Sequence, residues 1–362
     1  MKTASAVSVV RNPIDAVQYL RGIAAFVVFL FHISSLTVAT WGPSAAGIDH
    51  VGAAGVDLFF VISGFIMAMI LSRPGDFSPR EFLVRRIARV FPGYYIATIG
   101  VFVLAIMVPT AMASTSADIF KLLRSLAFFP WEDQYGSTAP LLLVGWTLNY
   151  EVYFYALVAI IAGMFGDRGL FKTAGVLVSI VVIGWIVAPD HPTVAFYTNS
   201  ILLEFALGIL AWHCHMRLQG NCAETLSFFV FTGGVAFFAL QHESDPGIYR
   251  VLVWGVPSAM ILFGSLRMMR FSNAPLRLLG DWSYSFYLTH LFIITGYIRF
   301  IMPVMPDLHL IWGAHYAVMT IICLTVAWVF HELVEKRTNQ LLLRLFSRTP
   351  PKGAEVPVAA SA

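Results

Sequence analysis

The chain has 362 residues, of which 58% are hydrophobic and only 12% are charged, and its mean hydropathy is +0.77. Soluble domains carry about 25% charged residues, so this composition leaves too little polar surface to coat a water-soluble globule of this size. The net charge of +3 comes from short basic clusters between apolar segments, which argues against a nucleic-acid-binding protein.

Ten apolar runs have about the length needed to cross roughly 30 Å of hydrocarbon as helices that rise 1.5 Å per residue. They cover residues 20–39, 52–71, 94–112, 150–165, 173–188, 200–213, 225–240, 248–266, 283–301 and 310–330. The first run is too long for a cleaved signal peptide and contains His32, so we expect it to be retained. The sequence therefore predicts an all-α, multi-pass integral membrane bundle of about ten transmembrane helices.

Ten spans place both termini on one side of the membrane, and the basic residues indicate which side. If the termini are cytoplasmic, 19 of the 23 Lys and Arg residues are cytoplasmic too, and the outer side keeps only Lys121, Arg124, Arg250 and Arg299. Membrane proteins carry an excess of Lys and Arg on their cytoplasmic loops. We therefore expect both termini in the cytoplasm.

The segments outside the spans complete the expected organisation. We expect a cytoplasmic tail at residues 1–13, one membrane domain at residues 14–337, and a cytoplasmic tail at residues 338–362 whose end, rich in Pro and Ala, is disordered. The longest outer connection, residues 113–149, is aromatic enough to argue against plain disorder. No metal site is expected, because the His and Cys residues at positions 213–222 match no zinc-binding spacing.

Arg21 and His32 are the most informative polar pair in the first span. They are 11 residues apart, about three turns, so they lie on nearly the same helix face and about 16 Å apart along the axis. Arg21 would lie at the cytoplasmic entrance, where it can bind a phosphate, and His32 near the bilayer midplane, where an imidazole suits a general base. The alternative is a snorkelling Arg and a hydrogen-bonded interior His.

Other polar groups at membrane depth are each explained as well by a structural role as by a functional one. The small residues near Asp57 permit close helix packing. Glu151 beside Trp146 and Tyr150 fits an aromatic belt at the membrane interface. Glu204 or His290 can be a hydrogen-bonded group in the bundle interior. The positions concerned are Asp57 in the second span, Trp146, Tyr150 and Glu151 at the start of the fourth, Glu204 in the sixth and His290 in the ninth.

A dense basic cluster precedes the third apolar run. Arg85, Arg86 and Arg89 lie shortly before Pro92 and Tyr94. One interpretation is a positive-inside anchor, which accounts for the number of charges but not for their placement beside a proline and a tyrosine pair. The other is a phosphate clamp at the cytoplasmic mouth, since Arg binds phosphate through two parallel hydrogen bonds.

Six segments, taken in chain order, resemble a known family. They are Tyr19–Gly22 followed by Phe31–His32, Gly55–Phe65, Arg85–Tyr95, Trp146–Tyr155, Leu279–His290 and His331–Glu335. Together they resemble the membrane acyltransferase-3 superfamily of bacterial sugar O-acyltransferases over residues 14–335. Within it the chain is most similar to the exopolysaccharide O-acetyltransferases of the ExoZ kind.

The resemblance implies a location, a donor and an acceptor. The implied location is a bacterial inner membrane, and the implied donor co-substrate is acetyl-CoA or another acyl-CoA. The implied acceptor is a carbohydrate hydroxyl of an exopolysaccharide or other surface glycan, either free or linked to a lipid. It implies no metal and no nucleic acid, and it names polysaccharide-assembly proteins as further partners. Acetyl or succinyl groups remain equal alternatives for the acyl group.

The resemblance and the local chemistry together give each candidate residue an expected role. The donor-binding residues are expected to be Arg21, Arg85, Arg86, Arg89 and Tyr94. The expected catalytic residues are His32, Arg21 and Glu151. His32 would deprotonate the acceptor hydroxyl or would first take the acyl group covalently. The acceptor is expected to contact Asp57, Trp146, Tyr150, Glu204 and His290.

Three other functions remain open at this point. A transporter or flippase of a lipid-linked saccharide would use His32 and Glu151 as a proton relay, although no inverted repeat is visible in the sequence. A non-catalytic scaffold of polysaccharide assembly would leave the midplane His32 without a purpose. An acyltransferase could also act on a lipid, on peptidoglycan or on a small secondary metabolite.

Overall fold

The structure is a computed structural model, and it describes residues 14–41, 52–73, 77–108, 117–133, 136–166, 169–218, 220–241, 247–269, 271–304 and 312–347. Within these ranges every regular element is helical and no strand occurs. Ten helical segments there are long and apolar enough to cross a membrane, which confirms the predicted all-α bundle. The expected tail at residues 1–13 and the last part of the expected tail at residues 338–362, residues 348–362, lie outside the described residues. The first part of the C-terminal tail is helical, since residues 338–346 belong to the last helix.

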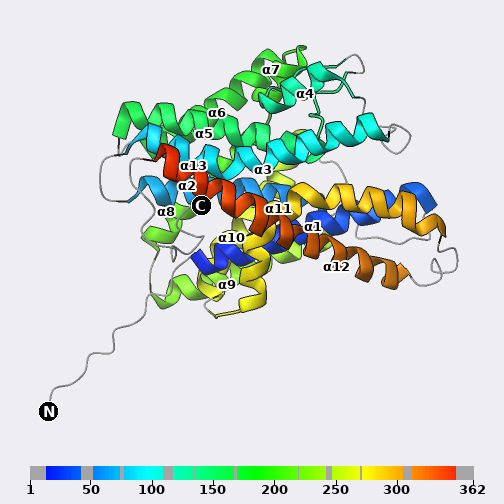
Figure 1. The fold of residues 1–362 in the computed structure, drawn as a ribbon. Coiled ribbons are helices and arrows are strands. Elements are labelled where there is room, and N and C mark those ends of the chain that lie inside the picture. The colour runs from blue at the N-terminus through cyan, green and yellow to red at the C-terminus, as the bar shows by residue number, and fades with distance from the viewer. Residues whose placement is uncertain are drawn as a thin grey trace.

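The helices follow the predicted runs closely (Figure 1). The spans are built on α1 (Ile14–Trp41), α2 (Gly55–Leu71), α3 (Pro79–Met107), α5 (Trp146–Phe165), α6 (Gly169–Val187), α8 (Leu202–Arg217), α9 (Asn221–Leu240), α10 (Val256–Met268), α11 (Ala274–Gly296) and α12 (Trp312–Phe330). The shorter helices are α4 (Ile119–Leu126), α7 (Pro192–Tyr197) and α13 (Lys336–Phe346). The part of the chain that the structure describes also contains π-helical turns at Val251–Gly255, Tyr297–Ile301 and His331–Glu335. We call the end of the bundle at which α1, α3 and α11 begin the basic end.

The third span begins well before its apolar run. Pro79 occupies the first turn of α3, and the Ser78 side chain accepts a hydrogen bond from the backbone N–H of Glu81, so a capped helix starts there. The arginines at positions 80–89 consequently lie on the first turns of α3, and not in a loop as expected from hydropathy. Arg85 and Arg86 then point about 100° apart around the helix, and Arg89 lies between these two directions.

The long connection between α3 and α5 is also more ordered than a plain loop, as its aromatic content predicted. Within its described residues, α4 lies beside α7 in Figure 1. Thr193 Oγ1 of α7 donates to the carbonyl of Pro130, at 2.8 Å, and so joins the two regions. Together they cover the bundle at the end opposite the basic end.

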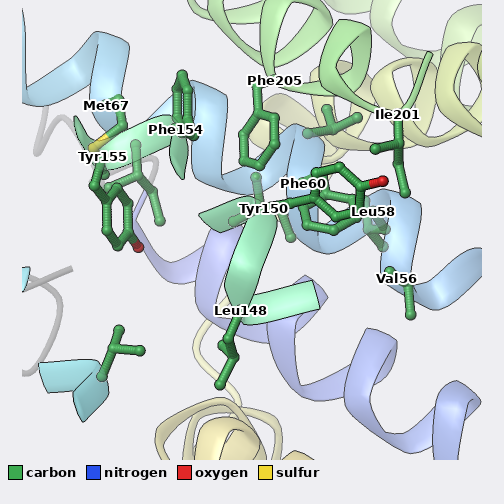
Figure 2. Close-up of a cluster of buried hydrophobic side chains, with 14 of the residues drawn as sticks. Val56, Leu58, Phe60, Met67, Leu148, Tyr150, Phe154, Tyr155, Ile201 and Phe205 are labelled. Atoms are coloured by element: carbon green, nitrogen blue, oxygen red, sulfur yellow. The ribbon is translucent and has the colours of Figure 1, made fainter. Parts of the chain in front are cut away.

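Helices α2 and α8 pack backbone against backbone through one glycine on each. A Cβ atom at Gly64 would lie 2.0 Å from the carbonyl oxygen of Phe205, and one at Gly208 would lie 2.0 Å from that of Val61. Small residues at such positions let membrane helices approach closely. The approach brings Phe205 against the ring of Phe60 at 5.0 Å, in the aromatic layer shown in Figure 2.

Replacing Gly208 with alanine is expected to destabilise the protein by about 1–3 kcal/mol, because the added methyl group must push a backbone apart. The matched control is Gly100→Ala on α3, where the new Cβ would have no atom within 4 Å. That change is expected to be neutral or to stabilise the helix by up to about 1 kcal/mol. Thermal unfolding of both variants in detergent measures the difference, and equal melting temperatures would contradict this packing.

Candidate active site

Helices α1 and α11 lie side by side (Figure 1). This arrangement brings together His32 of α1 and His290 of α11. A Cβ atom at Gly22 would lie 2.8 Å from the backbone nitrogen of Gly280, so only glycine permits this approach. His32 and His290 each follow their glycine by ten residues. Because the two helices run in the same direction, the register set by the glycines also brings the histidines into contact.

The His32–His290 contact has a defined polarity when both rings are neutral. Nδ1 of His290 lies 3.1 Å from the carbonyl oxygen of Phe286, and a carbonyl can only accept, so this nitrogen carries the proton. Nε2 of His290 is then an acceptor, and it lies 3.0 Å from Nδ1 of His32, which must donate. This tautomer leaves Nε2 of His32 as an unprotonated base. His290 is fully buried, whereas His32 is partly exposed.

A cavity lies nearer the basic end, between α1, α2, α3, α5 and α11. It contains about 770 Å³ of space free of protein atoms, including the part open to solvent. Its polar lining comprises Arg21, Ser63, Arg86, Arg89, Thr147, Glu151, Tyr155, Ser283, Tyr284 and Tyr287. Three guanidinium groups and one carboxylate give the lining an excess of positive charge, which suits an anionic ligand.

The arginines of the cavity are held by their neighbours. Arg21 is 7% exposed, and its Nη1 donates to Oε1 of Gln18 at 3.2 Å. Arg86 is 5% exposed and lies 5.6 Å from the ring centre of Tyr155, whose hydroxyl donates to Glu151. Within the described residues the Nε of Arg86 has no hydrogen-bond partner, so this side chain keeps a donor for a ligand.

Two of the predicted donor-binding residues lie outside the cavity lining. Arg85 points away on α3 and forms an ion pair with Glu81 at 3.0 Å. Tyr94 is fully buried farther along α3, where its hydroxyl donates to the carbonyl of Ser125 at 3.2 Å and its ring packs on Phe128. The structure thus brings Arg21, Arg86, Arg89 and Glu151 together and separates Arg85 and Tyr94 from them.

Asp57 and Glu204 belong to a different cluster, nearer the other end of the bundle. Both are 0% exposed, and Arg250 binds Asp57 through two hydrogen bonds of 2.9 and 2.8 Å. Glu204 lies 3.9 Å from the Nε of the same guanidinium. The guanidinium also lies 5.9 Å from the ring centre of Trp146 and 4.7 Å from that of Trp254. One arginine therefore joins two predicted carboxylates and one predicted aromatic residue.

A family model described as an acyltransferase domain, acyltransferase 3, matches residues 14–332. The chain belongs to the acyltransferase-3 family. This acyltransferase is 33% identical to the exopolysaccharide production protein ExoZ of Rhizobium meliloti, over 68% of this chain and 77% of that protein. It is 26% identical to BcsY of Komagataeibacter xylinus, over 90% of this chain and 82% of that protein. BcsY is assigned by inference as a membrane-bound transacylase.

A third relative of this acyltransferase is larger. It is the Bacillus subtilis protein YrhL, named as an inferred peptidoglycan O-acetyltransferase, with 26% identity over 82% of this chain but only 52% of that protein. No solved structure matches the chain. The family and the ten apolar helices together make this a multi-pass membrane acyltransferase.

Several residues of the acyltransferase site were missed by sequence reasoning. Tyr287 lines the cavity, its hydroxyl forms a hydrogen bond with Thr147 Oγ1 at 3.1 Å, and its ring lies 5.8 Å from that of His290. It is thus a lining residue that also contacts the histidine pair. Arg250 was noted only as one of four basic residues on the predicted outer side. The available signal was that a carboxylate within a membrane span, such as Asp57, needs a cationic partner.

Proposed function

We propose that the protein transfers a short acyl group, such as acetyl, from an acyl-CoA to a hydroxyl group of a cell-surface glycan. The observation that carries this proposal is the cavity with three converging arginines, Arg21, Arg86 and Arg89. CoA carries phosphates, and guanidinium groups are well suited to bind them. By the positive-inside rule the basic end faces the cytoplasm of a bacterial inner membrane, where acyl-CoA is found.

The acyl transfer itself is assigned to His32. Its free Nε2 takes the proton of the acceptor hydroxyl while the oxygen attacks the thioester carbonyl. The CoA thiolate then leaves and receives that proton, so no net proton is consumed. A covalent variant, in which Nε2 takes the acyl group first, uses the same nitrogen. Glu151 and Tyr155 lie in the cavity beside the arginines, so we assign them to donor positioning.

The route from the cavity to His32 passes Tyr287. His32 is not among the residues that line the cavity, whereas Tyr287 lines it and lies beside His290. The hydroxyl of Tyr287 is hydrogen-bonded to that of Thr147. We propose that this hydrogen bond breaks when the thioester enters. The partial exposure of His32 leaves another side of the ring for the acceptor.

The names of the relatives support the choice of acceptor. ExoZ is named for exopolysaccharide production and YrhL for peptidoglycan O-acetylation. Both names point to carbohydrate in the cell envelope. An exopolysaccharide is the acceptor we favour, because the 33% identity to ExoZ is the higher of the two.

The experiment that tests this proposal uses the purified full-length protein in proteoliposomes. Acetyl-CoA with a labelled acetyl group is added together with the surface glycan isolated from a strain in which the gene is deleted. We expect base-labile label on the glycan, and mass spectrometry of that glycan should show acetyl groups missing relative to the parent strain. If neither acetyl-CoA nor succinyl-CoA labels the glycan, and the two glycans have equal masses, the proposal is wrong.

Replacing His290 with leucine is expected to lower kcat by about 10- to 100-fold with little change in the KM for acyl-CoA, because the acceptor that fixes the His32 tautomer is lost. His290→Gln keeps a side-chain acceptor and should restore part of kcat. Steady-state kinetics of both variants check this. If His290 has only a structural role, the folded fractions of His290→Leu and His290→Gln should have the same kcat.

A further inference from the structure

A second hollow opens at the end of the bundle opposite the basic end, and none of the residues given a role under the proposed function lines it. This outer groove lies between residues 136–139, α7 with the following Asn199, and Trp146 and Tyr150 on the first turns of α5. It contains about 970 Å³ of space free of protein atoms, including the part open to solvent. That is room for a ligand of several rings.

The groove combines aromatic rings with neutral hydrogen-bonding groups. Trp146 is partly exposed, and Phe196 stacks on Tyr150 with ring centres 3.9 Å apart. Asn199 is exposed, and its Oδ1 accepts from the backbone N–H of Ile201 at 3.0 Å, which leaves the amide N–H groups to donate outward. The hydroxyl of Ser137 lies on the facing segment. A sugar offers the complement, with C–H faces for rings and hydroxyls for amides and hydroxyls.

Two other hollows on the molecule differ from this groove in their chemistry. One is lined mainly by apolar side chains such as Ile180 and Ile183, and the other by residues such as Leu207 and Leu226. The first lies between α5, α6 and the short helix α7, and the second lies between α8, α9 and α10. Their largely apolar walls suit acyl chains of lipid. The outer groove instead lies where the chain leaves the membrane, and its described lining contains polar side chains but no charged one. That lining favours a neutral sugar over a uronic acid.

The ring of Trp146 is held in place by residues that pack against it, as is expected for a ring on which a sugar stacks. Arg250 lies 5.9 Å from the ring centre, and its own position is set by two hydrogen bonds to buried Asp57. Phe60 and Tyr150 meet the indole edge-on, at 6.4 and 6.0 Å. A ring held this way loses little conformational freedom when a ligand stacks on it.

Neighbouring residues at the start of α5 line the groove and the donor cavity. Trp146 lines the groove, and the next residue, Thr147, lines the cavity and holds Tyr287. We propose that the outer groove binds neutral sugar residues of the glycan acceptor, stacked on Trp146 and hydrogen-bonded by Asn199. That the bound glycan is the acceptor rests on the proposed acyl transfer, whereas the binding itself does not.

The test measures binding and transfer separately on the full-length protein in nanodiscs. Calorimetry with neutral β-1,4- and β-1,3-glucan pentasaccharides and with pentagalacturonate as the acidic probe gives the affinities. We expect a neutral pentasaccharide to bind more tightly than pentagalacturonate. Trp146→Ala should weaken that binding by about tenfold and Asn199→Ala by about fivefold. Trp146→Phe keeps a ring in case the alanine variant does not fold, and it should bind with intermediate affinity.

The matched control is Trp185→Ala, since Trp185 lies on α6, is 50% exposed and is not part of the groove. Its affinity for the neutral pentasaccharide should equal that of the native protein. The inference is overturned if no neutral pentasaccharide binds at millimolar concentration, if pentagalacturonate binds more tightly, or if Asn199→Ala and Trp146→Phe both bind as the native protein does. Pentasaccharide binding without any transfer from acyl-CoA would instead reject the proposed function and leave the groove as a saccharide site.

Discussion

Replacing His32 with glutamine is expected to lower kcat for acyl transfer by about two to four orders of magnitude, which is the usual contribution of a general acid–base group. Glutamine can still donate a hydrogen bond to Nε2 of His290, so the contact between α1 and α11 should survive. It cannot take a proton from the acceptor hydroxyl. Labelled-acetyl transfer to the glycan, normalised to folded protein, measures the loss.

A buried histidine away from the His32–His290 pair supplies the control for this experiment. His315 on α12 is 1% exposed and forms a hydrogen bond with the Tyr297 hydroxyl at 2.9 Å, but it does not line the cavity. His315→Gln should therefore keep kcat near the native value. Native activity in His32→Gln would remove His32 from the mechanism. Equal losses in both variants would show that the loss reflects disturbed packing rather than lost base catalysis.

The spans were predictable from the sequence because the membrane leaves few choices. A backbone in hydrocarbon must satisfy its own hydrogen bonds, so an apolar run of sufficient length becomes a helix. The start of α3 at Pro79 was not predictable by hydropathy, because arginines occupy its first turns. Its 29 residues extend about 43 Å, more than the hydrocarbon thickness, so the charged turns reach beyond the apolar run.

The site was partly predictable, and the limit is helix register. The spacing of Arg21 and His32 on one helix predicts nearly the same helix face for both. The contact of His32 with His290 depends on how α1 meets α11, which the glycines at 22 and 280 decide. A pattern within one helix carries no such information. In the same way, the pairing of Asp57 with Arg250 joins residues 193 positions apart.

Exchanging Arg21 for lysine is expected to raise the KM for acyl-CoA by about 10- to 100-fold, although the charge is kept. Lysine offers a point charge, whereas arginine binds phosphate with two parallel hydrogen bonds, and bonds to charged groups contribute about 1.5–3 kcal/mol each. Arg89→Lys should act in the same direction, because Arg89 also lines the cavity. Initial rates at varied acyl-CoA and saturating glycan give the values.

Arg85 is the matched control for this prediction, because it lies one helical turn from Arg89 on α3 but does not line the cavity. Its guanidinium pairs with Glu81 near the surface, and an exposed pair of this kind contributes about 0–1 kcal/mol. Arg85→Lys should therefore change the KM for acyl-CoA by less than about twofold. A positive-inside anchor alone would make all three arginines equivalent, because lysine preserves the charge that the anchor needs. Equal KM values for Arg21→Lys, Arg89→Lys and Arg85→Lys would thus favour the anchor, whereas a large rise confined to the two cavity residues requires a bound phosphate.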